Sequence, residues 1–159
     1  MLKEGDKAPN FTLNTANSDN VTLSDFLGKI VIVYFYPKNN TPGCTKQACS
    51  FRDNYSHFKT NNIVVIGISN DSEKSHEKFI NKYNLPFILL SDPTLETIKN
   101  YGVWQEKFNF GVKALGIVRT TFIVNEKGYI QKVFEKVKPD TNSTEILNYL
   151  GISSSDTGI

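Results

Sequence analysis

The stretch IVIVYFYPKNNTPGCTKQAC, residues 30–49, combines a strand pattern, a turn and the beginning of a helix. Residues 30–36 form an unbroken apolar and β-branched run, which is typical of a strand covered on both faces of a sheet. Turn-forming residues occupy 37–43, and from 44 to about 60 the apolar residues recur at helical spacing. This order predicts a central strand whose carboxyl end leads through a short loop into a helix.

The rest of the chain continues the alternation of strands and helices. The expected elements are an N-terminal hairpin around 11–23, a strand at 63–69, a helix at 72–83, an extended piece at 85–90, a short helix capped by Asp92 or Thr94 and ending at Tyr101, a hairpin with strands 120–124 and 129–134, and a helix at 143–150. This order predicts an α/β fold of the thioredoxin-like class, with a mixed central sheet, helices on both faces and an N-terminal β-hairpin.

Length and composition limit the class of protein. The 159 residues fit one domain, expected to span 1–150 and to be followed by a frayed tail at 151–159. The net charge is only +2 and acidic residues lie between the lysines, so nucleic acid is not expected as a partner. No apolar segment reaches the roughly 20 residues of a membrane span, and the first residues lack a signal-peptide pattern. A cytoplasmic protein without membrane contact is therefore predicted.

The chain has two cysteines, Cys44 and Cys49, separated by four residues. Two cysteines are too few for a disulfide framework, and a close pair in a reducing compartment is more often redox-active or metal-binding. Cys44 lies where the loop after the central strand meets the helix, a place where open α/β sheets commonly bind ligands. Because a helix N-terminus favours anions, a thiol there should form the thiolate more readily than free cysteine does.

Helical phase separates the two thiols. Cys44 shares an apolar stripe with Ala48, Phe51, Tyr55 and Phe58. We therefore expect Cys44 to point inward, whereas Cys49 lies on another face and should be more exposed. Helical positions five apart have Cα atoms roughly 8.6 Å from each other, beyond the ~7 Å limit for a disulfide. A bond between these thiols thus requires the first turns of the helix to unwind.

Other interpretations of the cysteine pair are weaker. A dithiol oxidoreductase normally carries C-x-x-C, a closer spacing than this one. A zinc site needs two more ligands, and His57 and His76 form no closely spaced pair, so each is interpreted as an ordinary helix-surface residue. An inert core cysteine explains one thiol better than it explains two flanking a helix N-terminus.

The segment YFYPKNNTPGCTKQACSFRD, residues 34–53, resembles the active-site segment of peroxiredoxins. The resemblance is to the bacterioferritin comigratory protein or Q-type branch, in which a second cysteine follows five positions on. Pro37, Thr41 and Cys44 meet the family pattern, and Arg119 in GIVRTTFIVNEKG matches the expected arginine. Because KEGDKAPNFTL, LPFILLSD and YGVW also match, the resemblance covers most of residues 3–150.

The resemblance implies a thiol-dependent peroxidase that reduces hydrogen peroxide and organic hydroperoxides in antioxidant defence. Cys44 would be the peroxidatic nucleophile that becomes a sulfenic acid, and Cys49 would be the resolving cysteine of an intramolecular disulfide. Thr41 and Arg119 would hold the thiolate and the peroxide, and Pro37 would shield the nucleophile from bulk water. Thioredoxin or a similar dithiol protein would reduce the disulfide. Neither metal, haem nor flavin is implied, and a monomer is expected.

A second hypothesis comes from a different functional class. The chain could be a redox-sensing or chaperone-like module of thioredoxin fold that uses the disulfide as a signal. Only an enzyme would consume many equivalents of peroxide when a dithiol reductant is supplied, so turnover distinguishes the two hypotheses.

Overall fold

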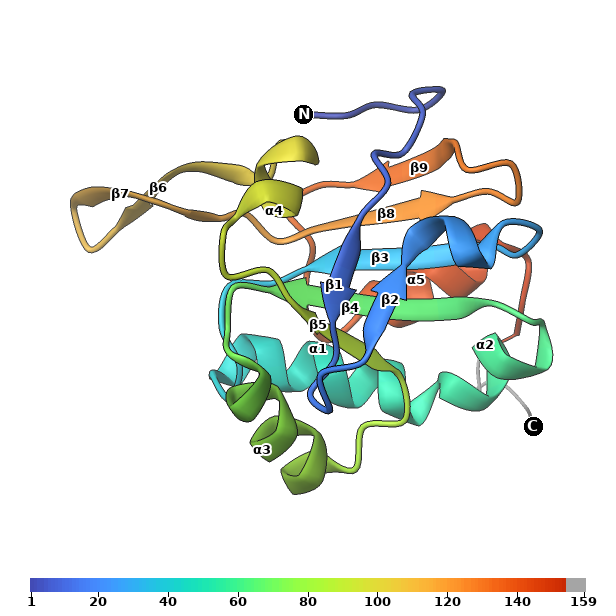
Figure 1. The fold of residues 1–159 in the computed structure, drawn as a ribbon, viewed down its shortest axis with the longest axis horizontal. Coiled ribbons are helices and arrows are strands. Elements are labelled where there is room, and N and C mark those ends of the chain that lie inside the picture. Colours follow the sequence, from blue (N-terminus) through green and yellow to red (C-terminus); the bar gives the residue numbers. More distant parts are fainter. Residues whose placement is uncertain (154–159) are drawn as a thin grey trace.

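The computed structural model describes residues 1–153, which fold around a mixed β-sheet (Figure 1). Within these residues the sheet has seven strands in the order β2-β1-β5-β4-β3-β8-β9. Their bounds are β1 Thr12–Asn14, β2 Asn20–Thr22, β3 Val31–Phe35, β4 Val64–Ser69, β5 Ile88–Ser91, β8 Thr120–Val124 and β9 Ile130–Phe134. The central strands β3, β4 and β5 are parallel, and the flanking strands run antiparallel to their neighbours. The predicted mixed sheet, with its N-terminal hairpin β1–β2, is thereby confirmed.

Helices cover both faces of the sheet (Figure 1). They are α1 Pro42–Asp53, α2 Tyr55–Thr60, α3 Glu73–Tyr83, α4 Glu96–Asn100 and α5 Asn142–Tyr149, together with the 3-10 helix η1 Leu23–Phe26. The inward side chains of α1, α2, α3 and α5 share one core cluster on one face, and α4 packs with the N-terminal segment on the other. The layers are those expected of a thioredoxin-like fold.

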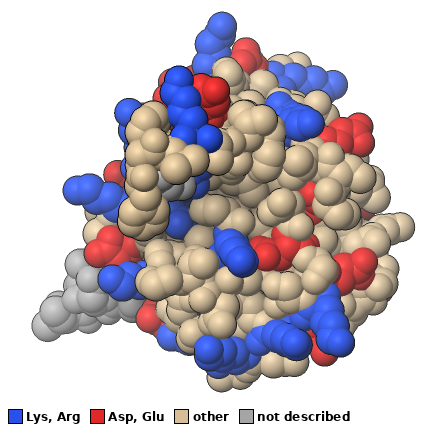
Figure 2. Space-filling view, turned by 90° about the vertical axis from the view of Figure 1, so that its left-hand side faces the viewer, with Lys and Arg blue, Asp and Glu red and all other residues tan. Residues whose placement is uncertain are grey.

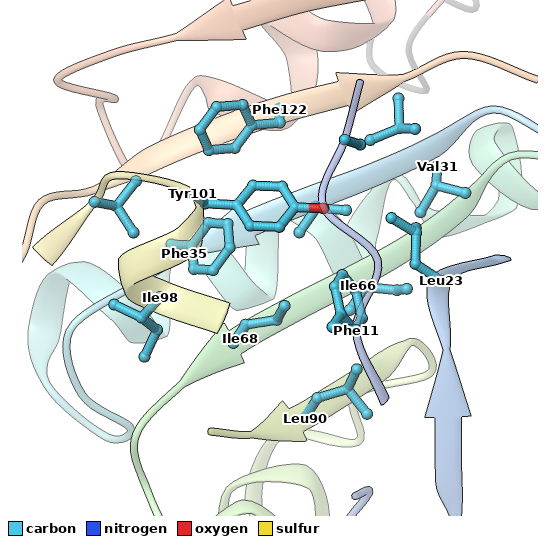
Figure 3. Packing of buried hydrophobic residues seen from close by; sticks show 14 of the residues in the cluster. Phe11, Leu23, Val31, Phe35, Ile66, Ile68, Leu90, Ile98, Tyr101 and Phe122 are labelled. Atoms are coloured by element: carbon cyan, nitrogen blue, oxygen red, sulfur yellow. The ribbon is translucent and has the colours of Figure 1, made fainter. Parts of the chain in front are cut away.

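One core layer lies between the sheet and α4 (Figure 3). Tyr101 is fully buried there, with its ring edge-to-face on Phe122 and tilted against Phe35. Its hydroxyl donates to the backbone oxygen of Pro9 at 2.7 Å, so the buried polar atom is satisfied. This contact fixes the N-terminal segment against the sheet.

The second core layer lies under α1 and contains the thiol of Cys44. The Tyr34 ring stacks on Phe51 at 4.7 Å between centroids, and Phe51 packs against Phe58. Cys44, Phe51 and Phe58 are buried, and the half-buried Tyr55 packs against the same cluster. The predicted inward stripe of this helix is therefore confirmed.

Two elements differ from the prediction, and part of a third expectation falls on residues that the structure does not describe. The helix expected from residue 44 to about 60 begins at Pro42 and is divided at Asn54, whose side chain bonds to Ser50 O and Ser143 Oγ. A two-stranded sheet, β6 Trp104–Asn109 and β7 Val112–Ile117, was not expected because its apolar residues give no clear core pattern. Three of them, Phe108, Val112 and Leu115, are exposed, and so is Phe110 in the turn between the strands. Of the expected tail at 151–159, residues 154–159 lie outside the described residues.

The β6–β7 hairpin projects from the end of the sheet at which β3 leads into α1 (Figure 1). Viewed toward that end, basic and acidic side chains are interspersed around a largely uncharged surface (Figure 2). Among the described helices, none is long and apolar enough to cross a membrane.

Candidate active site

The loop after β3 is anchored by the buried side chain of Asn39. Its amide oxygen accepts from the Tyr36 hydroxyl at 2.6 Å, and its amide nitrogen lies 2.9 Å from His76 Nδ1. The Asn39 backbone N–H donates to Asp71 Oδ2 at 2.9 Å, so this loop is tied to the segment that leads into α3. These bonds fix the direction in which the chain enters α1.

His76 is fully buried, so its interpretation as a helix-surface residue is wrong. Its Nε2 lies 3.1 Å from the backbone oxygen of Leu90, and Nδ1 accepts from Asn39, which defines one neutral tautomer. The imidazole can be buried on the inward side of α3 because each ring nitrogen has a hydrogen-bond partner. His57, on α2, is partly exposed. Helical phase could have detected the difference, since His76 lies three positions before the buried Phe79.

Burial lowers the pKa of His76 below its usual 6.5, against the opposing effect of Asp71. As the pH falls below 6.5, His76 is protonated in the unfolded chain before it is protonated in the folded protein. The contribution of His76 to the free energy of unfolding is therefore fully present above pH 6.5 and is lost progressively below it. We expect the free energy of unfolding to decline by at most about 1.4 kcal/mol per pH unit from this one proton. Urea denaturation at several pH values between 7.5 and 5 measures the decline.

The comparison variants for this pH effect are His76→Gln and His57→Gln. His76→Gln removes the buried imidazole and should flatten the profile, whereas His57→Gln should retain it. Burial raises the pKa of Asp92. Because Asp92 is present in the unmodified protein and in both variants, its contribution to the pH dependence cancels in the comparison. An unchanged slope in His76→Gln would show that another group causes the acid sensitivity.

The first turn of α1 brings Cys44 to the carboxyl end of β3. Thr41 is the extended N-cap residue and Pro42 occupies the first turn, a position where its missing N–H costs no helical bond. The Thr41 hydroxyl donates to the backbone oxygen of Lys38 at 2.9 Å. Cys44 is 2% exposed and its thiol is free. The reactive atom thus lies at the positive end of a helix and out of bulk water.

Arg119 reaches Cys44 from the segment between β7 and β8, 75 residues further along the chain. Its Nη2 donates to Cys44 Sγ at 3.3 Å, and its Nη1 donates to Gln47 Oε1 at 2.7 Å. A Cβ added at Gly43 would lie 3.2 Å from Nη2, so the guanidinium rests against the backbone of the first turn. Such a fixed cation stabilises negative charge on sulfur and on an oxygen that binds beside it.

Gln47 is a site residue that sequence reasoning missed. It is fully buried, and its amide nitrogen donates to Asn142 Oδ1 at 3.2 Å while its oxygen accepts from Arg119. Asn142 Oδ1 also accepts from the Thr121 hydroxyl at 2.8 Å. Gln47 follows Cys44 by three positions, so helical phase places it on the same face. Its amide fixes the orientation of the guanidinium.

Cys49 lies apart from this centre. Its thiol is free and partly exposed, in agreement with the predicted separation of the two cysteines. It lines a surface hollow of about 400 Å³ together with Ser50, Asp53, Asp140 and Thr144. Both cysteines belong to the continuous helix α1, so they do not form a disulfide in this conformation.

Pro37 lies beside the β6–β7 hairpin. It lines a hollow of about 250 Å³ with Trp104, Lys107, Gly116 and Ile117 among its neighbours. The structure therefore brings Cys44 and Arg119 into contact, with Thr41 and Pro37 on the loop just before them. Among residues 1–153 no group of three or more acidic, histidine or cysteine side chains could hold a metal ion.

Comparisons with known proteins agree on one family. The sequence model of the AhpC/TSA family matches residues 4–133. A bcp protein of Coxiella burnetii is 50% identical over 149 residues, covering 94% of this chain and 99% of its own, and the peroxiredoxin Bcp of Bacillus subtilis is 43% identical, covering 94% and 95%. A cysteine-to-serine mutant of the Q-type peroxiredoxin of Xylella fastidiosa has a similar structure, with a TM-score of 0.89, 34% identity and coverage of 95% and 96%.

Proposed function

The chain belongs to the AhpC/TSA family of peroxiredoxins and is a thiol peroxidase, and we propose that Cys44 is its peroxidatic nucleophile and Cys49 its resolving cysteine. The main support for the role of Cys44 is the 3.3 Å contact between Arg119 Nη2 and the buried Cys44 Sγ. A thiol held by a cation at a helix N-terminus is suited to react as the thiolate.

The first chemical step is a two-electron oxidation of Cys44. The thiolate attacks the terminal oxygen of a hydroperoxide, a sulfur–oxygen bond forms and the peroxide bond breaks. The released hydroxide or alkoxide takes up a proton and leaves as water or alcohol, and Cys44 becomes a sulfenic acid. The bacterioferritin comigratory protein of Xanthomonas campestris has alkyl peroxide reduction activity. Its structure resembles this one, with 31% sequence identity and a TM-score of 0.84 over 89% of this chain and 90% of its own. This likeness supports organic hydroperoxides as substrates alongside hydrogen peroxide.

The neighbouring residues have distinct proposed roles. Arg119 would donate to the thiolate and to the departing oxygen, because its guanidinium offers several donors in a fixed plane. Thr41, whose own proton is directed to Lys38 O, would accept the peroxide O–H with its hydroxyl oxygen. Pro37 would close the site toward the β6–β7 hairpin and limit access of water.

Resolution requires α1 to open. Cys49 must reach Cys44 Sγ, displace its oxygen as water and form the disulfide, which an intact helix does not permit. The later part of α1 is held to α5, where Ser50 and Asn54 both bond to Ser143 Oγ. The first turn makes the Cys44–Arg119 contact, which oxidation of the thiolate weakens. Gln47, between the two cysteines, also bonds to Arg119 and Asn142, and these bonds must break as well. We therefore propose local unwinding from the first turn once in every cycle.

A thioredoxin-type dithiol protein would then return both cysteines to thiols. This reduction supplies two electrons and two protons, and no metal or bound cofactor takes part in the proposed cycle. Such a cycle operates in a reducing compartment, which supports the expected cytoplasmic location.

The test is peroxide turnover by the unmodified protein and by Cys49→Ser. With thioredoxin, its reductase and NADPH, the unmodified protein should consume many equivalents of peroxide. Cys49→Ser should consume one equivalent at an unchanged rate and accumulate a sulfenic acid that dimedone traps, because only the resolving thiol is missing. Mass spectrometry of the trapped protein locates the modified residue.

Two outcomes contradict the proposal. If the unmodified protein is oxidised once and does not turn over with a dithiol reductant, the redox-sensor hypothesis is the better one. If Cys49→Ser fails to undergo the first oxidation, the roles of the two cysteines are wrongly assigned.

A further inference from the structure

Asn142, the first residue of α5, places a polar side chain on the buried side of that helix. It is fully buried, and Ile146 and Leu147, one turn further along, belong to the core layer under α1. Burying an amide is costly unless hydrogen bonds compensate for the lost water. Asn142 Nδ2 has no hydrogen-bond partner among the described residues, so part of this cost remains. Core packing therefore does not account for an asparagine at this position.

The amide oxygen of Asn142 connects α5 with α1 and with β8. It accepts from Gln47 Nε2 at 3.2 Å and from the Thr121 hydroxyl at 2.8 Å. Gln47 Oε1 in turn accepts from Arg119 Nη1 at 2.7 Å. Thr121 lies two residues after Arg119, the spacing at which side chains share one side of an extended chain. The bonds therefore form a closed circuit, from Arg119 through Gln47 and Asn142 back to the strand that follows Arg119.

Arg119 sets the direction of each bond in this circuit. A guanidinium has only donors, so Gln47 must present its amide oxygen to Nη1. The Gln47 amide nitrogen is then directed to Asn142, which must present its own oxygen. With an apolar residue in place of Asn142, the fully buried Gln47 nitrogen would lose its acceptor. Because an unpaired buried donor is costly, this loss would favour rotation of the Gln47 amide away from Arg119.

The guanidinium in this circuit is the one that contacts the reactive thiol. Arg119 Nη2 donates to Cys44 Sγ at 3.3 Å, and a guanidinium is planar, so a bond that fixes Nη1 also fixes the direction of Nη2. The side-chain bonds of Asn142 go to Gln47 and Thr121. Its influence on the thiol must therefore pass through Gln47.

We propose that Asn142 is a positioning residue for peroxide reduction, which holds the Gln47 amide in the orientation that directs Arg119 to the reacting atoms. The proposal rests on the proposed function, in which Cys44 is the nucleophile and Arg119 stabilises the departing oxygen. Asn142 touches neither the peroxide nor the thiol and transfers no proton. It contributes by fixing a donor in advance, which is most effective where charge develops in the transition state.

The test uses Asn142→Leu, which has a similar shape and removes the acceptor, in the Cys49→Ser background under single-turnover conditions. We expect the second-order rate constant with hydrogen peroxide to fall about three- to tenfold, as for the loss of one hydrogen bond. Asn142→Asp keeps an oxygen toward Gln47 and gives up only Nδ2, which has no partner among the described residues. It should retain most of the rate constant. Melting curves report the stability of both variants separately.

The matched control is Ser143→Ala, at the next position of α5. Ser143 is also fully buried, and its hydroxyl bonds to Ser50 Oγ and accepts from Asn54 Nδ2. These bonds join α5 to α1 without involving Arg119. Ser143→Ala should therefore lower the melting temperature and leave the rate constant with peroxide unchanged.

A double-mutant cycle with Gln47→Leu tests the route by which Asn142 acts. If Asn142 acts through the Gln47 amide, Asn142→Leu should add nothing to the loss of rate that Gln47→Leu causes. A general weakening of the fold would instead make the two losses additive.

The outcomes separate this proposal from the proposed function. If Asn142→Leu retains the rate constant, the inference about Asn142 is wrong while Cys44 and Arg119 keep their proposed roles. Equal losses of rate in Asn142→Leu and Asn142→Asp, a loss of the same size in Ser143→Ala, or additive losses in the cycle would show an effect of packing and would also overturn it. If the Cys49→Ser background itself does not react with peroxide, the proposed function fails first.

Discussion

Cys44→Ser is expected to lower peroxide consumption at least about a thousandfold, to the level of the uncatalysed reaction with the added reductant. A serine hydroxyl stays protonated at neutral pH and has no oxidation state equivalent to a sulfenic acid, so neither the attack nor the later disulfide is available. The coupled assay with thioredoxin, its reductase and NADPH measures the loss.

Folding must be shown to survive this substitution. Cys44 is 2% exposed and packs among apolar residues, so the more polar serine should cost about 1–2 kcal/mol. A melting curve and the far-ultraviolet circular dichroism spectrum test whether the loss of activity is chemical. A folded Cys44→Ser protein that still consumes peroxide at the original rate would show that another residue is the nucleophile.

Much of the fold could be predicted because its strands and helices have regular apolar patterns. Residues 31–36 are all buried, as an unbroken apolar run indicates, and the stripe from Cys44 to Phe58 faces the core. The β6–β7 hairpin could not be predicted in this way. Its apolar side chains, Phe110 among them, face solvent, and the hairpin is defined by its own cross-strand bonds more than by core packing.

The site could be predicted only where its residues are adjacent in the sequence or match the pattern of the family. The loop and Cys44 are contiguous, so their proximity follows from the chain itself. Arg119 comes from 75 residues away, and no periodicity could have shown that it reaches Cys44 Sγ. His76 was misjudged although helical phase places it on the same face as Phe79, and only the structure shows that Asn39 and Leu90 provide partners for both ring nitrogens.

Arg119→Met should lower the second-order rate constant for peroxide reduction by about 100- to 1000-fold, the usual effect of removing one fixed donor to a developing negative charge. Methionine keeps part of the apolar stem, so the lost guanidinium is the main change. Arg119→Lys should be intermediate, because an ammonium cannot reproduce the planar fork that bonds to both Cys44 and Gln47. Stopped-flow oxidation of the Cys49→Ser background under single-turnover conditions isolates this step.

The pH dependence of the same measurement separates two ways in which Arg119 could act. If it only increased the population of thiolate, the rates of the Arg119→Met and unmodified proteins would converge at high pH, where Cys44 is fully ionised in both. We expect a persistent deficit instead, because the guanidinium also stabilises charge on the departing oxygen after the thiolate has formed. Full convergence of Arg119→Met would contradict the role at the departing oxygen, and a melting curve of Arg119→Met shows whether its deficit is a loss of folded protein.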